Sequence, residues 1–263
     1  MKEFLALIVV VVLTGIIYWG VEPFAHGQMY PKVAPADYTF ADLKPLVAEG
    51  NAANGKEIVN ANCLACHSIK SEGMESPFAP EDALAAYGVV PPDLSSAGLI
   101  YEKNFLGNVV KNAAIAAKQT HKFDGNHPMP AYDWMSEQEI ADIVAYLRSI
   151  APQELSNKEV FIDACGRCHS VRYDKWSAEG GMTDYLGTKV PDLSMMIRSR
   201  SLDYLHTFIN DPQKRLAGTA MPRVGLTEKA ENQVVAYMES VGDSKKDERE
   251  ALGYKLIIFM VIM

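Results

Sequence analysis

All four cysteines of this 263-residue chain lie in two short patterns with the same spacing. In each pattern two residues separate the cysteines, and a histidine directly follows the second cysteine. Two thiols one helical turn apart can form thioether bonds to neighbouring edges of one porphyrin, and the adjacent histidine is then held under the iron. The spacing therefore predicts two covalently attached haem c groups. The two patterns consist of Cys63, Cys66 and His67, and of Cys165, Cys168 and His169.

Paired cysteines also occur in thioredoxin-like redox sites and in four-cysteine zinc sites. Neither kind of site needs a histidine after the second cysteine. A four-cysteine zinc site also does not need its two cysteine pairs to lie in separate segments of the chain, each with its own methionine. These two alternatives are therefore disfavoured by the pattern.

The second face of each iron needs a ligand of its own. Met129 and Met221 each precede a proline and each lie just before the last predicted helix of their segment. A methionine ligand raises the reduction potential, which suits electron transfer, so we predict both as axial ligands. His127 is an alternative to Met129, but the matching residue in the second segment is Thr219. The remaining methionines in these segments are expected to pack in the interior, namely Met135, Met182, Met195, Met196 and Met238.

The two patterns belong to an internal repeat. Residues 56–70 align with residues 158–172 at a constant offset of 102. Pro-Asp-Leu-Ser, Met-Pro and Val-Ala-Tyr then recur in the same order, at offsets of 99, 92 and 91. Two copies of one fold are therefore expected in tandem, with a boundary near Ala151-Pro152, where the proline ends a helical pattern.

Each repeat is predicted to be mainly α-helical. Ser136 with Glu139 forms a capping box before the last helix of the first repeat, and Thr227 caps the matching helix of the second. No segment between the helices shows strand alternation. Each repeat has too little regular structure to build a large hydrophobic core by itself. A buried prosthetic group would supply the missing apolar surface. The apolar residues at helical spacing are Ile140, Ile143, Val144, Leu147 and Ile150 in the first repeat and Val234, Val235, Met238 and Val241 in the second.

Pro92 and Pro191 each open a Pro-Asp-Leu-Ser sequence. As plain structure this is a turn whose Asp or Ser binds backbone amides. As part of a haem site, the proline carbonyl would accept a hydrogen bond from the iron-binding histidine and fix its ring. Arginines near the second site are candidates for binding haem propionates, although solvated surface arginines are equally expected; they are Arg198, Arg200 and Arg223.

The two ends of the chain differ from its middle. Residues 4–21 carry no charge and are long enough for a helical membrane span, and they exceed the apolar run of an ordinary cleaved signal peptide. Residues 256–263 are wholly apolar but too short to span a membrane. They are either an interfacial or packing segment or, as we expect, the start of a second membrane helix inside which the sequence stops. The predicted organisation is a membrane anchor at 1–24, a linker at 25–44, the first repeat at 45–151, the second repeat at 152–242, and at 243–263 a charged segment with the start of a possible C-terminal membrane helix.

The chain carries 25 Lys and Arg against 33 Asp and Glu, a formal net charge of −8. This balance disfavours nucleic-acid binding, which needs a basic surface, and suits positively charged partners. The acidic excess lies mainly in residues 39–151, which hold 8 basic and 14 acidic side chains, whereas residues 152–242 hold 11 and 12.

In order along the chain, the Cys-x-x-Cys-His segment, the Pro-Asp-Leu turn, the Met-Pro sequence and the closing helix resemble the class I cytochrome c fold twice over, across about residues 45–242. With the N-terminal anchor and the charged segment before the final apolar run, the chain resembles the dihaem cytochrome c1 family of bacterial quinol:cytochrome c reductases (cytochrome bc1 complexes). The C-terminus departs from that family, whose members continue as a membrane anchor. The resemblance implies two haem c groups, with iron ligands His67 and Met129, and His169 and Met221.

The same resemblance implies electron transfer from a Rieske iron–sulfur protein to a soluble cytochrome c or a terminal oxidase, beside cytochrome b. Covalent haem attachment in bacteria takes place outside the cytoplasm, so both repeats are expected in the periplasm, tethered to the inner membrane. No pairing of nucleophile and base, and no open metal position, is predicted, so the chain is expected to be an electron-transfer subunit rather than a catalyst by itself. The alternatives are the dihaem subunit of a cbb3-type oxidase, a tethered electron shuttle and, less favoured, a dihaem peroxidase.

Overall fold

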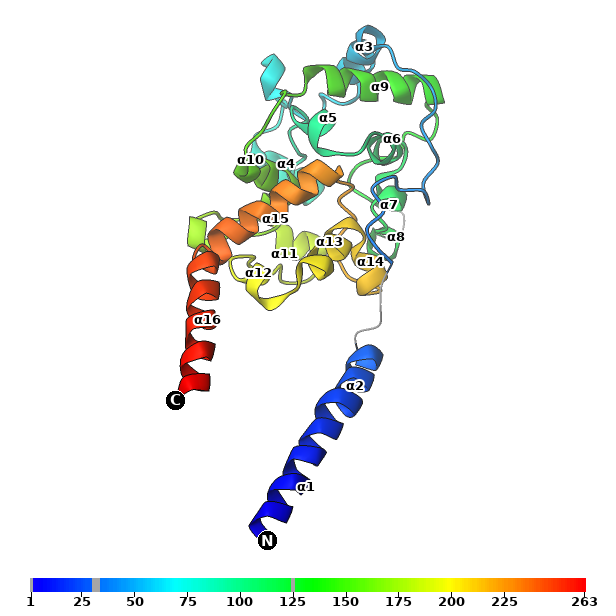
Figure 1. The fold of residues 1–263 in the computed structure, drawn as a ribbon. Coiled ribbons are helices and arrows are strands. Elements are labelled where there is room, and N and C mark those ends of the chain that lie inside the picture. Colours follow the sequence, from blue (N-terminus) through cyan, green and yellow to red (C-terminus); the bar gives the residue numbers. More distant parts are fainter. Residues whose placement is uncertain (1, 30–33, 124–125) are drawn as a thin grey trace. The chain divides into compact units, whose positions relative to one another are not determined.

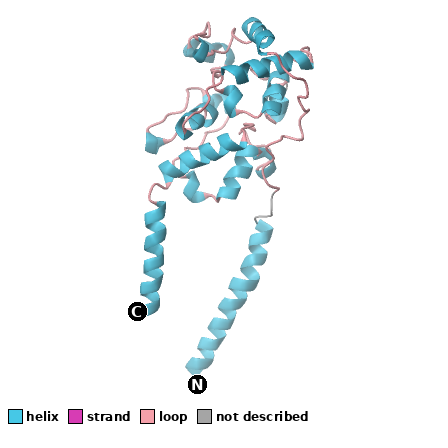
Figure 2. Ribbon diagram, turned by 45° about the horizontal axis from the view of Figure 1, so that its top comes forward, coloured by secondary structure: helices cyan, strands magenta, loops and turns pink. Residues whose placement is uncertain are grey.

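The computed structural model describes residues 2–29, 34–123 and 126–263. The chain forms two compact parts, Met1–Pro35 and Ala36–Met263. Over the described residues the regular structure is helical, and the only β-type pairings are isolated bridges (Figure 2). The predicted mainly α fold is confirmed.

The N-terminal part is an apolar helix (Figure 1). It consists of α1 (Lys2–Ile16), a π-helical turn (Ile17–Val21) and α2 (Glu22–Met29). Pro23 has no N–H, and its ring would clash with the carbonyl four residues earlier, so the widened π turn accommodates it. The 28-residue helix is long and apolar enough to cross a membrane. It extends beyond residue 24, the predicted end of the anchor.

The second part holds both repeats. Helices of the first repeat are α3 (Ala52–Asn62), α4 (Pro80–Tyr87), α5 (Ala97–Ile100), α6 (Lys103–Lys111), α7 (Ala113–Ala116), α8 (Thr120–Phe123) and α9 (Glu137–Ile150), with a 3₁₀ turn at Lys70–Glu72. Helices of the second are α10 (Asn157–Phe161), α11 (Met182–Leu186), α12 (Met196–Ser199), α13 (Leu202–Asn210), α14 (Pro212–Arg215) and α15 (Glu228–Gly242), with a π turn at Ile162–Gly166 and a 3₁₀ turn at Arg172–Asp174.

Each repeat is built around one pair of packed helices. In the first repeat α3 packs against α9, and in the second α10 packs against α15 (Figure 1). The backbones of α3 and α9 approach closely at Gly55, where a Cβ atom would lie only 1.9 Å from the carbonyl oxygen of Asp142. Only glycine fits this crossing. The buried side chains of α9 and α15 form the centres of the two main hydrophobic cores.

The repeat seen in the sequence recurs in the local geometry. Isolated β-bridges pair Ile69 with Met74 and Val171 with Trp176, at the same offset of 102 residues. Within these bridges Gly73 and Lys175 both have a positive φ, 69° and 57°. Lys175 thus takes a conformation that glycine favours, which shows that the turn geometry is retained although the residue type differs.

The ends of the helices follow the predicted capping. Ser136 and Glu139 form the capping box of α9, and the hydroxyl of Thr227 accepts a hydrogen bond from the amide of Ala230 in α15. A second capping box, which the sequence analysis missed, starts α10 with Ser156 and Glu159. The Ser-x-x-Glu pattern was visible in the sequence.

The two repeats are joined by backbone hydrogen bonds. The amide of Glu102 donates to the carbonyl of Gly225, and the amide of Thr227 donates to the carbonyl of Ile100, both at 2.9 Å. Ile100, from the first repeat, is buried in the core of the second. The segment that follows Met221 is therefore held by the first repeat.

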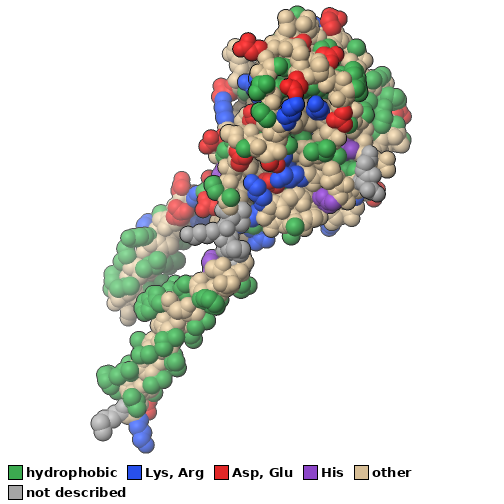
Figure 3. Space-filling model, turned by 90° about the vertical axis from the view of Figure 1, so that its right-hand side faces the viewer, with side chains coloured by type: hydrophobic (Ala, Val, Ile, Leu, Met, Phe, Trp, Pro, Cys, Tyr) green, Lys and Arg blue, Asp and Glu red, His purple; other side chains and the backbone are tan. Residues whose placement is uncertain are grey.

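Helix α16 (Lys246–Ile262) carries the charged segment and the apolar tail. Ion pairs of Lys246 with Glu239 and of Arg249 with Asp243 connect its first turn to α15. Residues 256–263 are all exposed, and Figure 3 shows apolar side chains over much of the surface of α16. At 1.5 Å per residue its 17 residues rise about 26 Å, less than a hydrocarbon core of about 30 Å.

Candidate functional site

The two cysteine–histidine segments form the same tight turn. After α3, the amides of Cys66 and His67 both donate to the carbonyl of Cys63, at 3.1 and 2.9 Å. In the second repeat the amides of Cys168 and His169 donate to the carbonyl of Cys165 at the same distances. Each turn therefore places two thiols and one imidazole on a single short stretch of backbone.

Both histidines make the hydrogen bond expected from the sequence. Nδ1 of His67 lies 2.7 Å from the carbonyl oxygen of Pro92, and Nδ1 of His169 lies 2.9 Å from that of Pro191. Because a carbonyl only accepts, Nδ1 must donate, and Nε2 keeps its lone pair for a metal. Burial lowers the pKa of both imidazoles, which favours the neutral form that binds iron.

The aspartate after each proline braces the turn. The Asp93 carboxylate accepts hydrogen bonds from the Ser68 hydroxyl at 2.7 Å, from the Lys70 amide at 3.1 Å and from the Ser95 amide at 2.9 Å. Burial by itself would raise the pKa of Asp93, but these hydrogen bonds hold it below its ordinary value. The carboxylate therefore stays ionised and ties the Pro-Asp-Leu-Ser segment to the attachment turn.

Asp192 repeats this arrangement in the second repeat. Its carboxylate accepts from the amides of Arg172 and Ser194, both at 3.0 Å. The matching pairs, Leu94 with Ser68 and Leu193 with Ser170, are joined by backbone hydrogen bonds of 2.9 Å. The two candidate sites thus share their supporting hydrogen bonds as well as their cysteines and histidines.

A cavity of about 330 Å³ opens beside the first attachment turn. Its wall is mainly apolar and includes Leu106 and Val110 of α6 and Ile143 and Leu147 of α9. A thioether-forming turn, an oriented imidazole and an apolar wall are the features that a haem c group needs, so the residues present fit that group. The predicted site residues that line the cavity are Cys63, Cys66, His67, Pro92 and Met129, together with Cys168 of the second repeat.

Met129 and its alternative as an axial ligand, His127, both line this cavity and are joined by a hydrogen bond. The amide of Met129 donates to Nδ1 of His127 at 3.1 Å. In the second repeat the amide of Met221 donates to the Thr219 hydroxyl at 3.4 Å. The residue two positions before the methionine therefore supports the turn in both repeats. His127 fills this structural role in the first repeat and Thr219 fills it in the second.

The second set of predicted residues is spread over more elements. Cys165 and His169 are buried, whereas Cys168 reaches the wall of the cavity described above. Met221 is half-buried and does not line that cavity. Its neighbour Ala220 accepts a hydrogen bond of 2.6 Å from the side chain of Gln119 in the first repeat. The Met221 segment is thus positioned from across the repeat boundary, which sequence spacing did not indicate.

The thiols lack the features of a redox or zinc site. None of the four cysteines takes part in a disulfide. Burial raises the pKa of Cys63 to about 11 and that of Cys165 to about 12, whereas a reactive redox thiol needs a lowered pKa. Within the described ranges, no group of three or more His, Cys, Asp or Glu side chains is arranged to hold a metal ion. These observations favour haem attachment over both alternatives.

The three candidate arginines differ in their surroundings. Arg223 is buried, lines the cavity and pairs with both carboxylate oxygens of Asp42, at 2.8 and 2.9 Å. Arg198 lies 3.9 Å from Asp243, and the Arg200 guanidinium lies over the ring of Tyr204. Only Arg223 of the three lines the cavity, and their role toward haem propionates stays a prediction. Among the methionines expected in the interior, Met135, Met182 and Met238 are buried, Met196 is partly buried, and Met195 is exposed.

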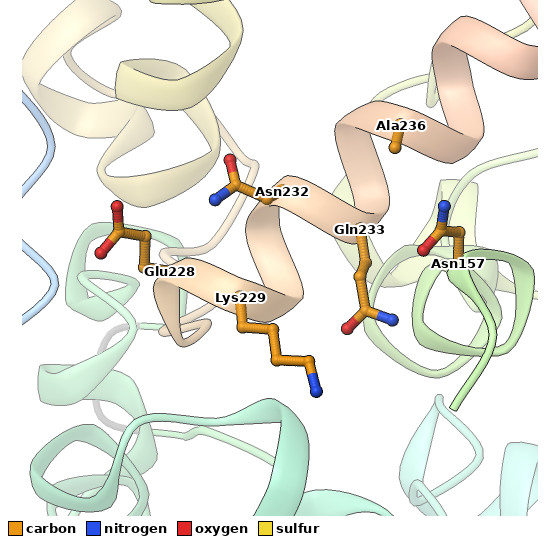
Figure 4. Close-up of a pocket in the computed structure, with 6 residues that line it drawn as sticks. All are labelled: Asn157, Glu228, Lys229, Asn232, Gln233 and Ala236. Atoms are coloured by element: carbon orange, nitrogen blue, oxygen red, sulfur yellow. The ribbon is translucent and has the colours of Figure 1, made fainter. Parts of the chain in front are cut away.

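A second hollow, of about 530 Å³, lies between α10 and α15. Figure 4 shows its lining of polar side chains, and none of them belongs to the predicted site. The side chain of Gln233 also hydrogen bonds to the carbonyl of Leu155 at 2.8 Å, which joins α15 to the segment before α10. This hollow is a surface feature of the helix pair. The residues labelled in Figure 4 are Asn157, Glu228, Lys229, Asn232, Gln233 and Ala236.

Comparisons with known proteins agree with the geometry of the first site. The cytochrome c family model matches residues 52–151. Cytochrome c of Tetrahymena pyriformis is 25% identical over 108 residues, which cover 40% of this chain and 93% of that protein. No solved structure matches the chain significantly. Residues 52–151 therefore form a cytochrome c domain, which implies covalently bound haem c and electron transfer.

Proposed function

We propose that the chain is the membrane-anchored dihaem cytochrome subunit of a bacterial quinol:cytochrome c reductase, a cytochrome bc1 complex. The observation that carries the proposal is the geometric equivalence of the two attachment turns. His169 makes the equivalent backbone hydrogen bond to that of His67, which lies in the cytochrome c domain, and Pro191 supplies to its ring the carbonyl that Pro92 supplies to His67. A second haem c on Cys165 and Cys168 follows from that equivalence, in a second cytochrome c domain at residues 152–242.

The bound haems supply one-electron oxidation and reduction, and the chain's own residues set their surroundings. The carbonyls of Pro92 and Pro191 accept hydrogen bonds from Nδ1 of the histidines, which would leave Nε2 free to bind the iron. Met129 and Met221 would provide the second axial ligands, whose thioethers favour a high reduction potential. The apolar wall formed by α6 and α9 would keep water away from the first haem. Nothing in this scheme requires the protein to make or break a bond in a substrate.

The proposed partners follow from the same assignment. Electrons would arrive from a Rieske iron–sulfur protein beside cytochrome b and would leave to a periplasmic cytochrome c or a terminal oxidase. The N-terminal helix supports a membrane tether, and haem attachment outside the bacterial cytoplasm favours a periplasmic location for both repeats. Protease added to spheroplasts should then degrade both repeats. Protection of either repeat would contradict this topology.

Affinity purification from native membranes distinguishes this proposal from its nearest alternative. Full-length chain purified in mild detergent should bring with it a cytochrome b and a Rieske protein. Co-purification with the catalytic subunit of a cbb3-type oxidase would replace the reductase assignment with the oxidase one. Recovery of the chain alone under conditions that keep the reductase intact would favour a tethered electron shuttle.

A further inference from the structure

Arg167 belongs to the second attachment segment, but its guanidinium reaches the first repeat. The residue stands directly before Cys168. Its Nη2 donates a hydrogen bond to the carbonyl oxygen of Val90. Val90 lies two residues before Pro92, the residue whose carbonyl holds His67. One arginine of the second repeat therefore contacts the segment that orients the histidine of the first.

The same arginine also lines the cavity of the first site. Arg167 shares that wall with Cys63, Cys66 and His67. Its side chain is 27% exposed, so the guanidinium is only partly solvated. The Nε atom is buried and has no hydrogen-bond partner, and the nearest carboxylate, that of Glu179, lies 3.5 Å away. An arginine is always charged, so this wall carries a partly compensated positive charge.

The first repeat has no arginine at the position equivalent to Arg167. The residue of the first repeat that corresponds to Arg167 is Ala65, whose methyl group cannot reach across to the second repeat. Haem attachment in the matched motif therefore does not require an arginine at this position.

We propose that Arg167 is a positioning residue for the haem of the first repeat: it fixes the Val90–Pro92 segment behind His67 and raises the reduction potential of that haem. The inference rests on the proposed function, because it requires haem c at both attachment turns. Reduction removes one positive charge from the iron. A fixed positive charge close by and poorly screened therefore stabilises the reduced state relative to the oxidised state. Arg167 would thus favour residence of the electron on the acidic first repeat.

Potentiometric titration of full-length, haem-loaded protein tests this role with a readout other than activity. The variants are Arg167→Gln, which removes the charge, and Arg167→Lys, which keeps it. The first haem is identified as the component whose potential falls in Met129→His. The matched control is Lys229→Gln, because Lys229 is exposed, lies in the second repeat and lines the surface hollow between α10 and α15, none of whose residues belongs to the predicted site.

We expect Arg167→Gln to lower the midpoint potential of the first haem more than that of the second. The expected change is about tenfold in the one-electron equilibrium constant, or about 59 mV. Arg167→Lys should retain most of the wild-type potential, and Lys229→Gln should leave both potentials close to wild type. An equal or larger shift at the second haem, no shift at either haem, or a lysine variant as low as the glutamine variant would overturn the proposal.

The haem content of each protein separates this test from the proposed function. Pyridine haemochrome analysis should give two haem c groups for the wild type and for every variant at position 167. A wild-type content below two would defeat the dihaem assignment itself. A content of two with unchanged potentials would leave the dihaem assignment intact and reject only the role of Arg167.

Discussion

The Nδ1 atom of His67 lies 2.7 Å from the carbonyl oxygen of Pro92, a residue 25 positions further along the chain. This one hydrogen bond connects the attachment turn at the end of α3 to the Pro-Asp-Leu-Ser segment before α5. Because the carbonyl occupies Nδ1, only Nε2 is free to bind iron. The same relationship between His169 and Pro191 is the main support for a second haem site.

Replacement of Met129 by histidine should lower the potential of one haem without loss of its low-spin state. An imidazole can still occupy the sixth position, but it does not favour the reduced iron as a thioether does. We expect the potential of the second haem to stay close to its wild-type value. A redox titration of Met129→His, followed in the α-band, measures both. Two unchanged potentials would show that Met129 is not a ligand.

Asp93→Asn should destabilise the haem-loaded protein at neutral pH. The carboxylate accepts three hydrogen bonds, of which those from Ser68 and Lys70 connect two segments, so its loss is expected to cost about 1–3 kcal/mol of unfolding free energy. The folded-state pKa of Asp93 lies below the ordinary value of 3.8. Its stabilisation is therefore fully present above that value and is lost as the pH falls through the lower, folded-state pKa.

Urea titrations at a series of pH values check both parts of this prediction. The difference in unfolding free energy between wild type and Asp93→Asn should be constant near neutral pH and should shrink in strong acid. Asp133→Asn, at an exposed position, is the control and should change stability little. A difference that grows as the pH falls would contradict the assigned direction of the pKa shift.

Gly55→Ala should separate α3 from α9. The added methyl group would meet the carbonyl oxygen of Asp142 at 1.9 Å, and a backbone atom cannot move aside without a shift of the helix. We expect a loss of at least about 1–3 kcal/mol, typical of overpacking. Gly253→Ala in α16, where a Cβ atom meets nothing within 4 Å, is the matched control. Equal urea midpoints for the two variants would show that the helix crossing does not depend on glycine.

Charge reversal on the first repeat should slow electron transfer to a basic soluble cytochrome at low salt. Residues 39–151 carry 14 acidic against 8 basic side chains, and attraction between opposite charges raises association rates until salt screens it. A matched reversal on the second repeat should have a smaller effect. An unchanged rate at low ionic strength would refute docking on the first repeat. The reversed residues are Glu72, Glu75, Glu81 and Asp82 in the first repeat and Glu154, Asp184, Asp203 and Glu228 in the control, all of them exposed.

Local patterns predicted the features that depend on neighbouring residues. The capping box at Ser136 and Glu139 marks the start of α9, and the proline at 152 marks its end, because both act through nearby backbone. The partner of each histidine was also foreseen, since Pro92 and Pro191 recur at equivalent places. The π turn before Pro23 was not, although a proline inside an apolar helix was visible.

Contacts across the repeat boundary could not be read from the sequence. The hydrogen bond from Arg167 to Val90 joins residues 77 positions apart, and that from Gln119 to Ala220 joins residues 101 positions apart. Spacing and periodicity report on one element at a time, whereas these contacts depend on how two folded repeats pack. The positive φ of Lys175 could not be predicted from the sequence either, because lysine, unlike glycine, is not typical of that conformation.

The central claim is that both attachment turns carry haem. Intact-mass spectrometry of the purified chain, produced in cells that attach haem c, tests it most directly. We predict a mass that exceeds the polypeptide by two haem groups, and by one group when Cys165 and Cys168 are both replaced by serine. A wild-type mass with a single haem, or with none, would contradict the account.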